Sequence, residues 1–485
     1  METLDSPTAE LLSQFIKNGG KVIAVGKKPT LIDGSKANFG DEWKTVELLK
    51  DSDATIAKLE NDIVKFKEIN PGDGRFHHMR RELEDGQVLF FANSSKEQKG
   101  FASLSMKGKS VLLMDAMDGT IKNYPATATN DEVSFSFELE PSESILFFVC
   151  DNGEKCADDA PVYTTCSVIE PKSPVRVTAT NPNVLPLCYP ELTFDGRTLS
   201  ELSTISLNDS LYNSRGFERG NPWWCAVQFK QDIVDKNKTY ADGSGFKLDY
   251  KFTIADEFDY SSLKATLELF YEATVTINGQ TITAIPNEYF LDREFKVFAI
   301  GQYVKAGENI LSIDAPRMDV MAEIEPAYIT GNFSLNAAES GFTIHKPTPL
   351  GLGSWKNQGR PFYNSEVVYS IDYEVTPSNA DCVVSLDKWD GTVAEVIVNG
   401  ESAGIIGWRP YKLNVSKLVK EGKNTVEVKV IGSNRNLLGP FIPSEGITGP
   451  WHWVRQSFLK SGADYNLFDY GLYTPFAFYK QNIQH

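Results

Sequence analysis

The chain has 485 residues, of which 41% are hydrophobic and 23% are charged, and its formal net charge is −17. A chain of this length usually folds around more than one hydrophobic core, so we expect three or four domains. Nucleic acids and anionic membranes bind basic surfaces, and a chain with this acidic balance does not supply one. The composition therefore argues against nucleic-acid and membrane partners and is compatible with an uncharged ligand.

The sequence shows no segment for export or for membrane insertion. No apolar run approaches the ~18 residues of a membrane helix, and residues 1–5 lack the basic and apolar regions of a signal peptide. Six cysteines are few for this length, and they form no CxxC pair or other metal-binding spacing. We therefore expect mostly buried thiols rather than a disulfide framework.

Residues 1–72 are typical of a small α/β unit. Ser6 and Pro7 suit the cap and the first position of a helix, which the apolar pattern continues to Ile16. The apolar run at residues 22–26 is typical of a strand buried on both faces of a parallel sheet. Two further helices are expected, over residues 42–50 and 54–66. Because the rest of the sheet is absent, we interpret this unit as the remnant of an α/β domain.

From residue 73 the pattern changes to short strands. Asp85-Gly86 and Asp118-Gly119 are tight-turn dipeptides, and each lies between two strand-like stretches. Residues 133–139 alternate between apolar and polar side chains, which predicts a further strand. Residues 73–155 are therefore expected to form a small antiparallel β-domain, followed by a linker rich in small and charged residues.

One strand–turn pattern occurs twice after residue 160. An alternating strand leads to Asn278-Gly279 in the first copy and to Asn399-Gly400 in the second, 121 positions later. Each copy then reaches a Gly-x-Asn turn, which ends at Asn309 and at Asn424. A repeat of this length indicates a duplicated domain. The chain is thus expected to be mainly β, with two tandem jelly-roll β-sandwiches over residues 160–345 and 346–485.

Paired carboxylates are the first candidates for chemistry. No phosphate-binding, HExxH or GxSxG motif occurs, and nothing in the sequence requires a cofactor. Glycoside hydrolases place two carboxyl groups across the scissile bond. The candidate pairs are Glu323 with Glu325, which would share one face of a strand, and Asp387 with Asp390, which span an expected loop. Solvated surface charges are the commoner explanation of such pairs. Asp387 and Asp390 are also candidate ligands of a structural calcium ion.

Tryptophans in loops are the stronger signal. Seven of the eight tryptophans lie in or beside loops rich in Gly, Pro and Asn. An aromatic face with amide or guanidinium groups nearby suits a neutral sugar ring, which needs an apolar platform and hydrogen bonds. The alternative is that each tryptophan fills the end of a sandwich. The candidate carbohydrate-binding residues are Trp355, Asn357, Gln358, Arg360, Trp408, Arg409 and Trp223.

Several segments resemble a known enzyme family. In matching order, they are similar to the C-terminal region of the α-L-rhamnosidase family of glycoside hydrolases (family 106): NPWWCAVQF, IEPAYITGNF, SWKNQGRPFYNSEVVY, KWDGTVAEVIVNG, GWRPY and NRNLLGPF. LLSQFIKNGGKVIAVGKKPTLIDG is similar to the amidotransferase-like α/β domain that follows the catalytic barrel in such enzymes. The resemblance implies galactose-binding-like jelly rolls that pack on the barrel, shape its cleft or bind sugar. It also implies that the catalytic carboxylates of the family belong to a barrel that this sequence does not contain.

These observations lead to three functional hypotheses. The first is a non-catalytic carbohydrate-binding or scaffolding portion of a rhamnosidase-like glycoside hydrolase. The second is a hydrolase in its own right, with carboxylates such as Glu325 on a sandwich face. The third is a structural module that assembles with a separate catalytic barrel chain. A deep aromatic cleft with two carboxyl groups at glycosidase spacing would favour the second hypothesis.

Overall fold

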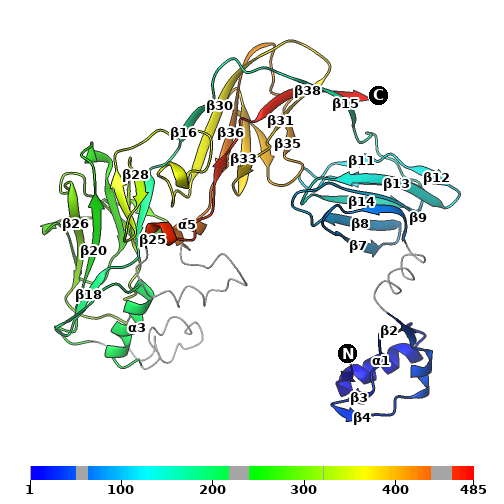
Figure 1. Ribbon diagram of the computed structural model, residues 1–485, viewed down its shortest axis with the longest axis horizontal. Coiled ribbons are helices and arrows are strands. Elements are labelled where there is room, and N and C mark those ends of the chain that lie inside the picture. The colour runs from blue at the N-terminus through cyan, green and yellow to red at the C-terminus, as the bar shows by residue number, and fades with distance from the viewer. Residues whose placement is uncertain (1, 51–63, 218–239, 321, 439–460, 485) are drawn as a thin grey trace. The chain divides into compact units, whose positions relative to one another are not determined.

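The computed structural model describes residues 2–50, 64–217, 240–320, 322–438 and 461–484 (Figure 1). The chain divides into two compact units, residues 1–162 with 484–485, and residues 163–483. Strands dominate both units, so the predicted mainly-β class is confirmed. Within the described residues, no helix has the length and apolar character needed to cross a membrane.

The first unit begins with helix α1 (Ser6–Lys17), close to the prediction. Its cap is Asp5 rather than Ser6, because a carboxylate oxygen of Asp5 accepts a hydrogen bond from the backbone N–H of Thr8 at 2.9 Å. Strand β2 (Ile23–Val25) pairs in parallel with β5 (Glu47–Leu49). The helix predicted over residues 42–50 is therefore wrong. A short apolar run is compatible with a helix or with a strand, and here pairing with β2 makes residues 47–49 a strand. The remaining short elements are β1 (Thr3–Leu4), β3 (Leu31–Ile32), β4 (Ser35–Lys36) and the 3-10 helix η1 (Asp41–Thr45).

Residues 64–150 form an antiparallel β-domain with two sheets, ordered β11-β10-β14-β8-β7 and β12-β13-β9-β6. Its buried core includes Leu89, Phe91, Phe137 and Phe147. The helix expected over residues 54–66 falls mainly outside the described residues, and its last three residues begin β6. The strands are β6 (Val64–Asn70), β7 (Phe76–Glu82), β8 (Gly86–Asn93), β9 (Gly100–Lys107), β10 (Ser110–Met114), β11 (Ile121–Asn123), β12 (Thr127–Thr129), β13 (Glu132–Leu139) and β14 (Ser144–Cys150).

The second unit contains two β-sandwiches. In the first, one sheet has the order β17-β27-β21-β25-β24, and the other has the order β19-β18-β20-β26-β22-β23. In the second of these sheets, β29 also pairs with β20, and β28 pairs with β29. Helix α3 (Thr204–Ser214) adds Leu207 and Leu211 to the core between them. The strands are β17 (Asn183–Leu187), β18 (Glu191–Phe194), β19 (Arg197–Leu199), β20 (Phe246–Ile254), β21 (Lys264–Glu268), β22 (Thr274–Ile277), β23 (Gln280–Thr281), β24 (Tyr289–Phe290), β25 (Asp292–Ala299), β26 (Gly307–Ala315), β27 (Ala327–Gly331), β28 (Ser334–Ala337) and β29 (Phe342–His345).

The second sandwich has a sheet ordered β15-β38-β31-β35 and a sheet ordered β16-β30-β36-β33-β34. Its core is rich in valine and tyrosine, and Val428 and Tyr369 are fully buried there. The strands are β15 (Val162–Val168), β16 (Arg176–Ala179), β30 (Glu366–Val375), β31 (Asp381–Ser385), β33 (Val393–Val398), β34 (Glu401–Ile406), β35 (Lys412–Asn414), β36 (Gly422–Ile431) and β38 (Ala477–Gln484), with β32 (Trp389–Asp390) and β37 (Gly471–Leu472) as a separate pair.

The boundary between the two sandwiches differs from the predicted ranges, residues 160–345 and 346–485. Strand β16 pairs with β30, with Val177 opposite Tyr369, so residues 162–179 belong to the second sandwich. The first sandwich is thus inserted between two strands that are neighbours in the sheet of the second. Local alternation identifies a strand, but it does not identify a partner almost 200 residues away.

Both repeated turns form as predicted. Asn278 and Asn399 have φ values of +49° and +54°, and a glycine with positive φ follows each, as tight hairpin turns require. The side-chain amide of each donates a hydrogen bond to a fully buried asparagine, Asn309 at 2.8 Å and Asn424 at 2.9 Å. The duplicated sequence pattern therefore corresponds to a duplicated pair of hydrogen-bonded asparagines.

The buried asparagine also closes the turn before its strand. Oδ1 of Asn424 accepts a hydrogen bond from the backbone N–H of Lys420 at 2.8 Å. Its amide donates to the carbonyls of Lys420 and Gly422 at 2.7 and 2.9 Å. Asn309 makes the equivalent bonds to the backbone of its own turn. A buried amide must find such partners within the protein, so each turn and its asparagine depend on each other.

We expect Asn424→Ala to lower the free energy of unfolding by about 2–3 kcal/mol, because it leaves several buried polar groups without partners. Urea unfolding followed by tryptophan fluorescence measures this loss. Asn357→Ala is the matched control, since Asn357 is exposed. A loss no larger in the Asn424 variant than in the control would contradict the structural role of the buried amide.

Candidate functional site

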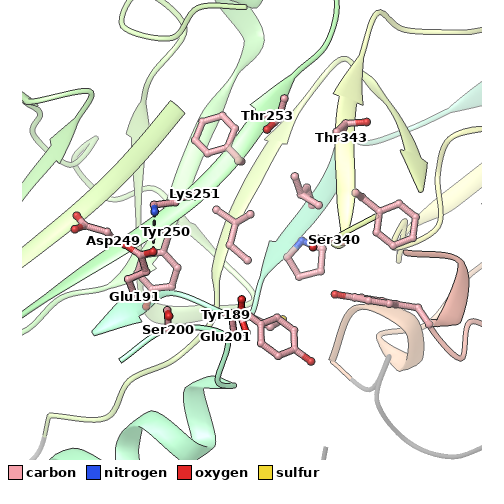
Figure 2. A pocket seen from close by; sticks show the side chains of 18 of the residues that line it. Tyr189, Glu191, Ser200, Glu201, Asp249, Tyr250, Lys251, Thr253, Ser340 and Thr343 are labelled. Atoms are coloured by element: carbon pink, nitrogen blue, oxygen red, sulfur yellow. Dashed lines mark hydrogen bonds and ion pairs between the residues drawn. The ribbon is translucent and has the colours of Figure 1, made fainter. Parts of the chain in front are cut away.

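A cavity of about 360 Å³ opens beside the first sandwich (Figure 2). It lies where β17, an edge strand of one sheet, approaches β20 of the other sheet. Its volume is within the range of small-molecule sites. We call this cavity the β20 pocket. Its lining consists of residues 185–189, 191, 200, 201, 249–253, 340–343, 362 and 465.

A gap in strand pairing forms one side of the β20 pocket. Strand β26 pairs with β20 along its whole length on one edge. On the other edge, β18 pairs only with residues 247–249, and β29 pairs only at Ile254. No described strand pairs with residues 250–253 along that edge, and all four line the pocket. Backbone groups on this stretch are therefore available to hydrogen-bond a ligand.

Aromatic side chains form the apolar part of the lining. Tyr250 and Phe252 are buried in the core of the first sandwich at the base of the pocket. Phe342 packs edge-on against Phe362 and Tyr465, with ring centroids 4.9 and 5.3 Å apart. The contact with Tyr465 joins segments that are more than 100 residues apart in sequence, whereas Phe362 lies 20 residues after Phe342. They hold an aromatic wall of the kind that supports a flat or ring-shaped ligand.

Charged groups lie beside this wall. The Lys251 ammonium donates a hydrogen bond to a Glu191 carboxylate oxygen at 2.7 Å, which raises the pKa of Lys251 (Figure 2). Asp249 forms an ion pair with Lys247 at 2.7 Å. Glu201 has no ion-pair partner within the part of the chain that the structure describes. The pocket thus combines aromatic faces with hydrogen-bonding groups at its opening.

The described lining supplies neither a thiolate nor a histidine-activated hydroxyl as a nucleophile. Burial raises the pKa of Cys188 to about 12, so its sulfur stays a protonated thiol rather than a nucleophilic thiolate. Among the described lining residues there is no histidine to activate a hydroxyl nucleophile. The described lining therefore offers carboxylates, aromatic surface and hydrogen-bonding groups.

The predicted carboxylates Glu323 and Glu325 precede β27, and Glu268 belongs to the same acidic group. Burial, followed by the charges of Glu323 and Glu268, raises the pKa of Glu325 to about 8. Burial, followed by the charge of Glu323, raises the pKa of Glu268 to about 7. The hydroxyl of Tyr250 donates a hydrogen bond to the Glu325 carbonyl at 2.7 Å, which connects this group to the pocket lining. Raised carboxyl pKa values are a property of general acids and also of buried structural acids.

The structure places Trp355 in the core instead of on the surface. Only 1% of this residue is exposed, and its indole N–H donates a hydrogen bond to the Tyr369 hydroxyl at 2.8 Å. Its prediction as a sugar platform is therefore wrong, and it fills the sandwich interior. Its neighbours in sequence do not form a binding face around it. Gln358 bonds the backbone of residues 351 and 354, and Arg360 is half-buried with its guanidinium over the Tyr363 ring.

Trp408 and Arg409 do lie together at a surface. Half of the Trp408 side chain is exposed, in the loop between β34 and β35. The Arg409 guanidinium lies 4.7 Å from the ring centroid of Tyr411, and Tyr411 packs edge-on against Trp389. This aromatic surface belongs to the second sandwich, and none of its residues lines the β20 pocket. Its role in sugar binding stays a prediction.

The remaining candidates are not brought together. Asp387 and Asp390 are exposed, and in the described ranges no three His, Cys, Asp or Glu side chains gather as metal ligands. The calcium site at these two residues stays a prediction. Trp223 lies outside the described residues. Cys150, Cys188 and Cys382 are buried free thiols, in line with the expectation.

Sequence reasoning missed the β20 pocket because no motif marks it. Its residues come from segments spread between residues 185 and 465, and only folding brings them together. The alternation in β20 was the one available signal, since it places Lys251 and Thr253 on the outer face of the sheet. Glu268 was missed for the same reason, because its proximity to Glu325 depends on the packing of distant segments.

Comparisons with known proteins give partial matches. No family model matches the chain. It is 29% identical over 112 residues to a "Putative beta-glucuronidase" of Formosa agariphila, a match that covers 22% of this chain and 10% of that protein. It is 28% identical over 195 residues to a secreted protein of Saccharomyces cerevisiae, covering 39% of this chain and 19% of that protein. The chain thus spans less than a fifth of the length of these curated relatives.

Glycoside hydrolases are among the solved structures that align with this chain. A rhamnosidase from a Novosphingobium species aligns over 99% of this chain and 33% of its own, with 13% identity and a TM-score of 0.41. An α-L-rhamnosidase from Streptomyces avermitilis aligns over 84% and 40%, with 10% identity and a TM-score of 0.22. A β-glucuronidase from Ruminococcus gnavus aligns over 53% and 41%, with 10% identity and a TM-score of 0.20. Structural alignments with TM-scores this low do not indicate a function.

Stability should fall as the pH rises from about 5 to 8. The folded-state pKa values of Glu325, about 8, and Glu268, about 7, exceed the ordinary value of 4.5, so the folded state binds more protons in this range. Their contribution is fully present below pH 4.5 and is lost as the pH rises through the folded-state values. Each group accounts for at most about 1.4 kcal/mol per pH unit. Thermal unfolding between pH 5 and pH 9 measures the slope.

Glu325→Gln should flatten this pH dependence and raise the Tm at pH 8, because the variant has no charge to bury. Glu401→Gln is the control, since Glu401 is exposed on β34. A slope for Glu325→Gln equal to that of the control would contradict the assignment of the pH dependence to Glu325.

Proposed function

We propose that this chain is a non-catalytic, carbohydrate-binding portion of a rhamnosidase-like glycoside hydrolase, and that the β20 pocket holds a sugar unit. The pocket is the observation that carries this proposal. It combines a volume of about 360 Å³, an aromatic wall at Phe342 and Tyr465, and the hydrogen-bonding groups of Glu191 and Lys251. A sugar ring has apolar faces and a rim of hydroxyl groups, and this lining complements both.

The similarity to the Formosa agariphila relative supports a carbohydrate-related role, although it covers a small part of that protein. The non-catalytic part of the proposal rests on the resemblance to the rhamnosidase family, which implies that the catalytic carboxylates belong to a separate barrel. A catalytic barrel chain and a glycan are the partners that follow from this proposal. The Trp408 surface would then be a second contact for the same glycan.

A glycan array identifies the ligand, and calorimetric titration with the best glycan measures its affinity. We expect Lys251→Met to weaken binding about tenfold or more, because it removes a charged donor but keeps the apolar stem of the side chain. Lys388→Met, an exposed change in the second sandwich, is the control and should bind like the parent chain. Absence of binding to any glycan would contradict the proposal. Loss of binding on Trp408→Ala alone would move the site to the Trp408 surface.

A hydrolase in its own right is the second candidate, and the raised pKa values of Glu325 and Glu268 favour it. A glycosidase acid must hold its proton near neutral pH, as both groups do. Release of aryl alcohol from aryl rhamnosides and aryl galactosides tests this candidate. Turnover that Glu325→Gln lowers at least 100-fold would overturn the non-catalytic proposal. Turnover at the level of buffer alone would rule out this candidate for those substrates.

A further inference from the structure

The β20 pocket has a surplus of negative charge. Three carboxylates line it, whereas Lys251 is the one cation among the described lining residues. Lys251 forms an ion pair with Glu191, and Lys247 forms one with Asp249, each at 2.7 Å. No ion pair in the described ranges neutralises Glu201. Glu201 is exposed at the opening of the pocket, and a carboxylate without a cation there repels anionic ligands and favours cationic ones.

The backbone holds Glu201 at the pocket in an unusual conformation. Its φ is +61°, in the left-handed region of backbone conformation that residues other than Gly, Asn and Asp seldom adopt. Two residues later, Ser203 caps α3, and its hydroxyl accepts a hydrogen bond from the backbone N–H of Ser206. Leu207 and Leu211 anchor α3 in the core, so the backbone of Glu201 lies three residues before a packed helix.

Aromatic rings accompany this carboxylate. The aromatic side chains of Tyr189 and Tyr465 line the same cavity. A carboxylate together with aromatic faces recognises an ammonium group, through an ion pair and through attraction of the cation to the π-system. A hydroxyl group of a neutral sugar would form a hydrogen bond to the carboxylate, but neither the ion pair nor the cation–π attraction.

We propose that the β20 pocket binds an amino sugar with a free amino group, and that Glu201 is the residue that selects it. This inference rests on the proposed carbohydrate-binding function and adds the substrate class. N-acetylation of the sugar removes the positive charge, and a uronic acid adds a repulsive negative one. Both kinds of glycan therefore bind more weakly than the free amine.

Calorimetric titrations with glucosamine tetrasaccharide, its fully N-acetylated counterpart and galacturonic acid tetrasaccharide test the inference. At pH 6 and low salt, we expect glucosamine tetrasaccharide to bind about tenfold more tightly than the N-acetylated one. Glu201→Gln should abolish most of this ratio, because it lowers the affinity for glucosamine tetrasaccharide. Glu401→Gln changes the net charge equally at an exposed site and should preserve the ratio. Added salt should reduce the preference, since it depends on charge.

The outcomes separate the two proposals. A preference that persists in Glu201→Gln would overturn the role of Glu201. Equal affinities for free, N-acetylated and uronic acid oligosaccharides, or binding of an unrelated neutral glycan alone, would overturn the amino-sugar class and leave the carbohydrate-binding function standing. Failure of every glycan to bind, in the array and in the titrations, would overturn the proposed function itself.

Discussion

Each sandwich of the second unit depends on one buried amide. Asn309 and Asn424 each connect an Asn-Gly hairpin to the turn that begins the longest strand pair of the sandwich. These pairs run without interruption over nine residues in the first sandwich and ten in the second. A slip of one residue would turn every core side chain toward solvent, so hydrogen bonds at the end of the strand protect the register. The β20 pocket lies along one strand of such a pair.

The β20 pocket exists because β20 is paired completely on one edge and incompletely on the other. Alternation along β20 directs Tyr250 and Phe252 into the core and Lys251 to the outside, so the gap exposes both apolar and charged groups. Phe362 and Tyr465 then close the pocket from segments beyond the first sandwich. Phe362 lies between β29 and β30, where the chain returns to the second sandwich, and Tyr465 comes from the segment that follows β36.

Two carboxyl environments in the first sandwich have opposite properties. Glu325 is mostly buried beside other acids, and its raised pKa keeps it largely neutral near pH 7. Glu201 is exposed at the opening of the pocket. Tyr250, which lines the pocket, donates a hydrogen bond to the Glu325 backbone carbonyl and so connects the two regions through one side chain.

The mainly-β class, the hairpin turns and the duplication could be read from the residues alone, because turn chemistry and strand alternation are local properties of neighbouring residues. The same holds for the surface position of Trp408 and Arg409. Folding was needed to show that β16 pairs with β30, that Trp355 belongs to the core, and that segments between residues 185 and 465 line one pocket. These features depend on which distant strands and side chains meet. Pairing of distant segments depends on the packing of the whole fold, which no short pattern specifies.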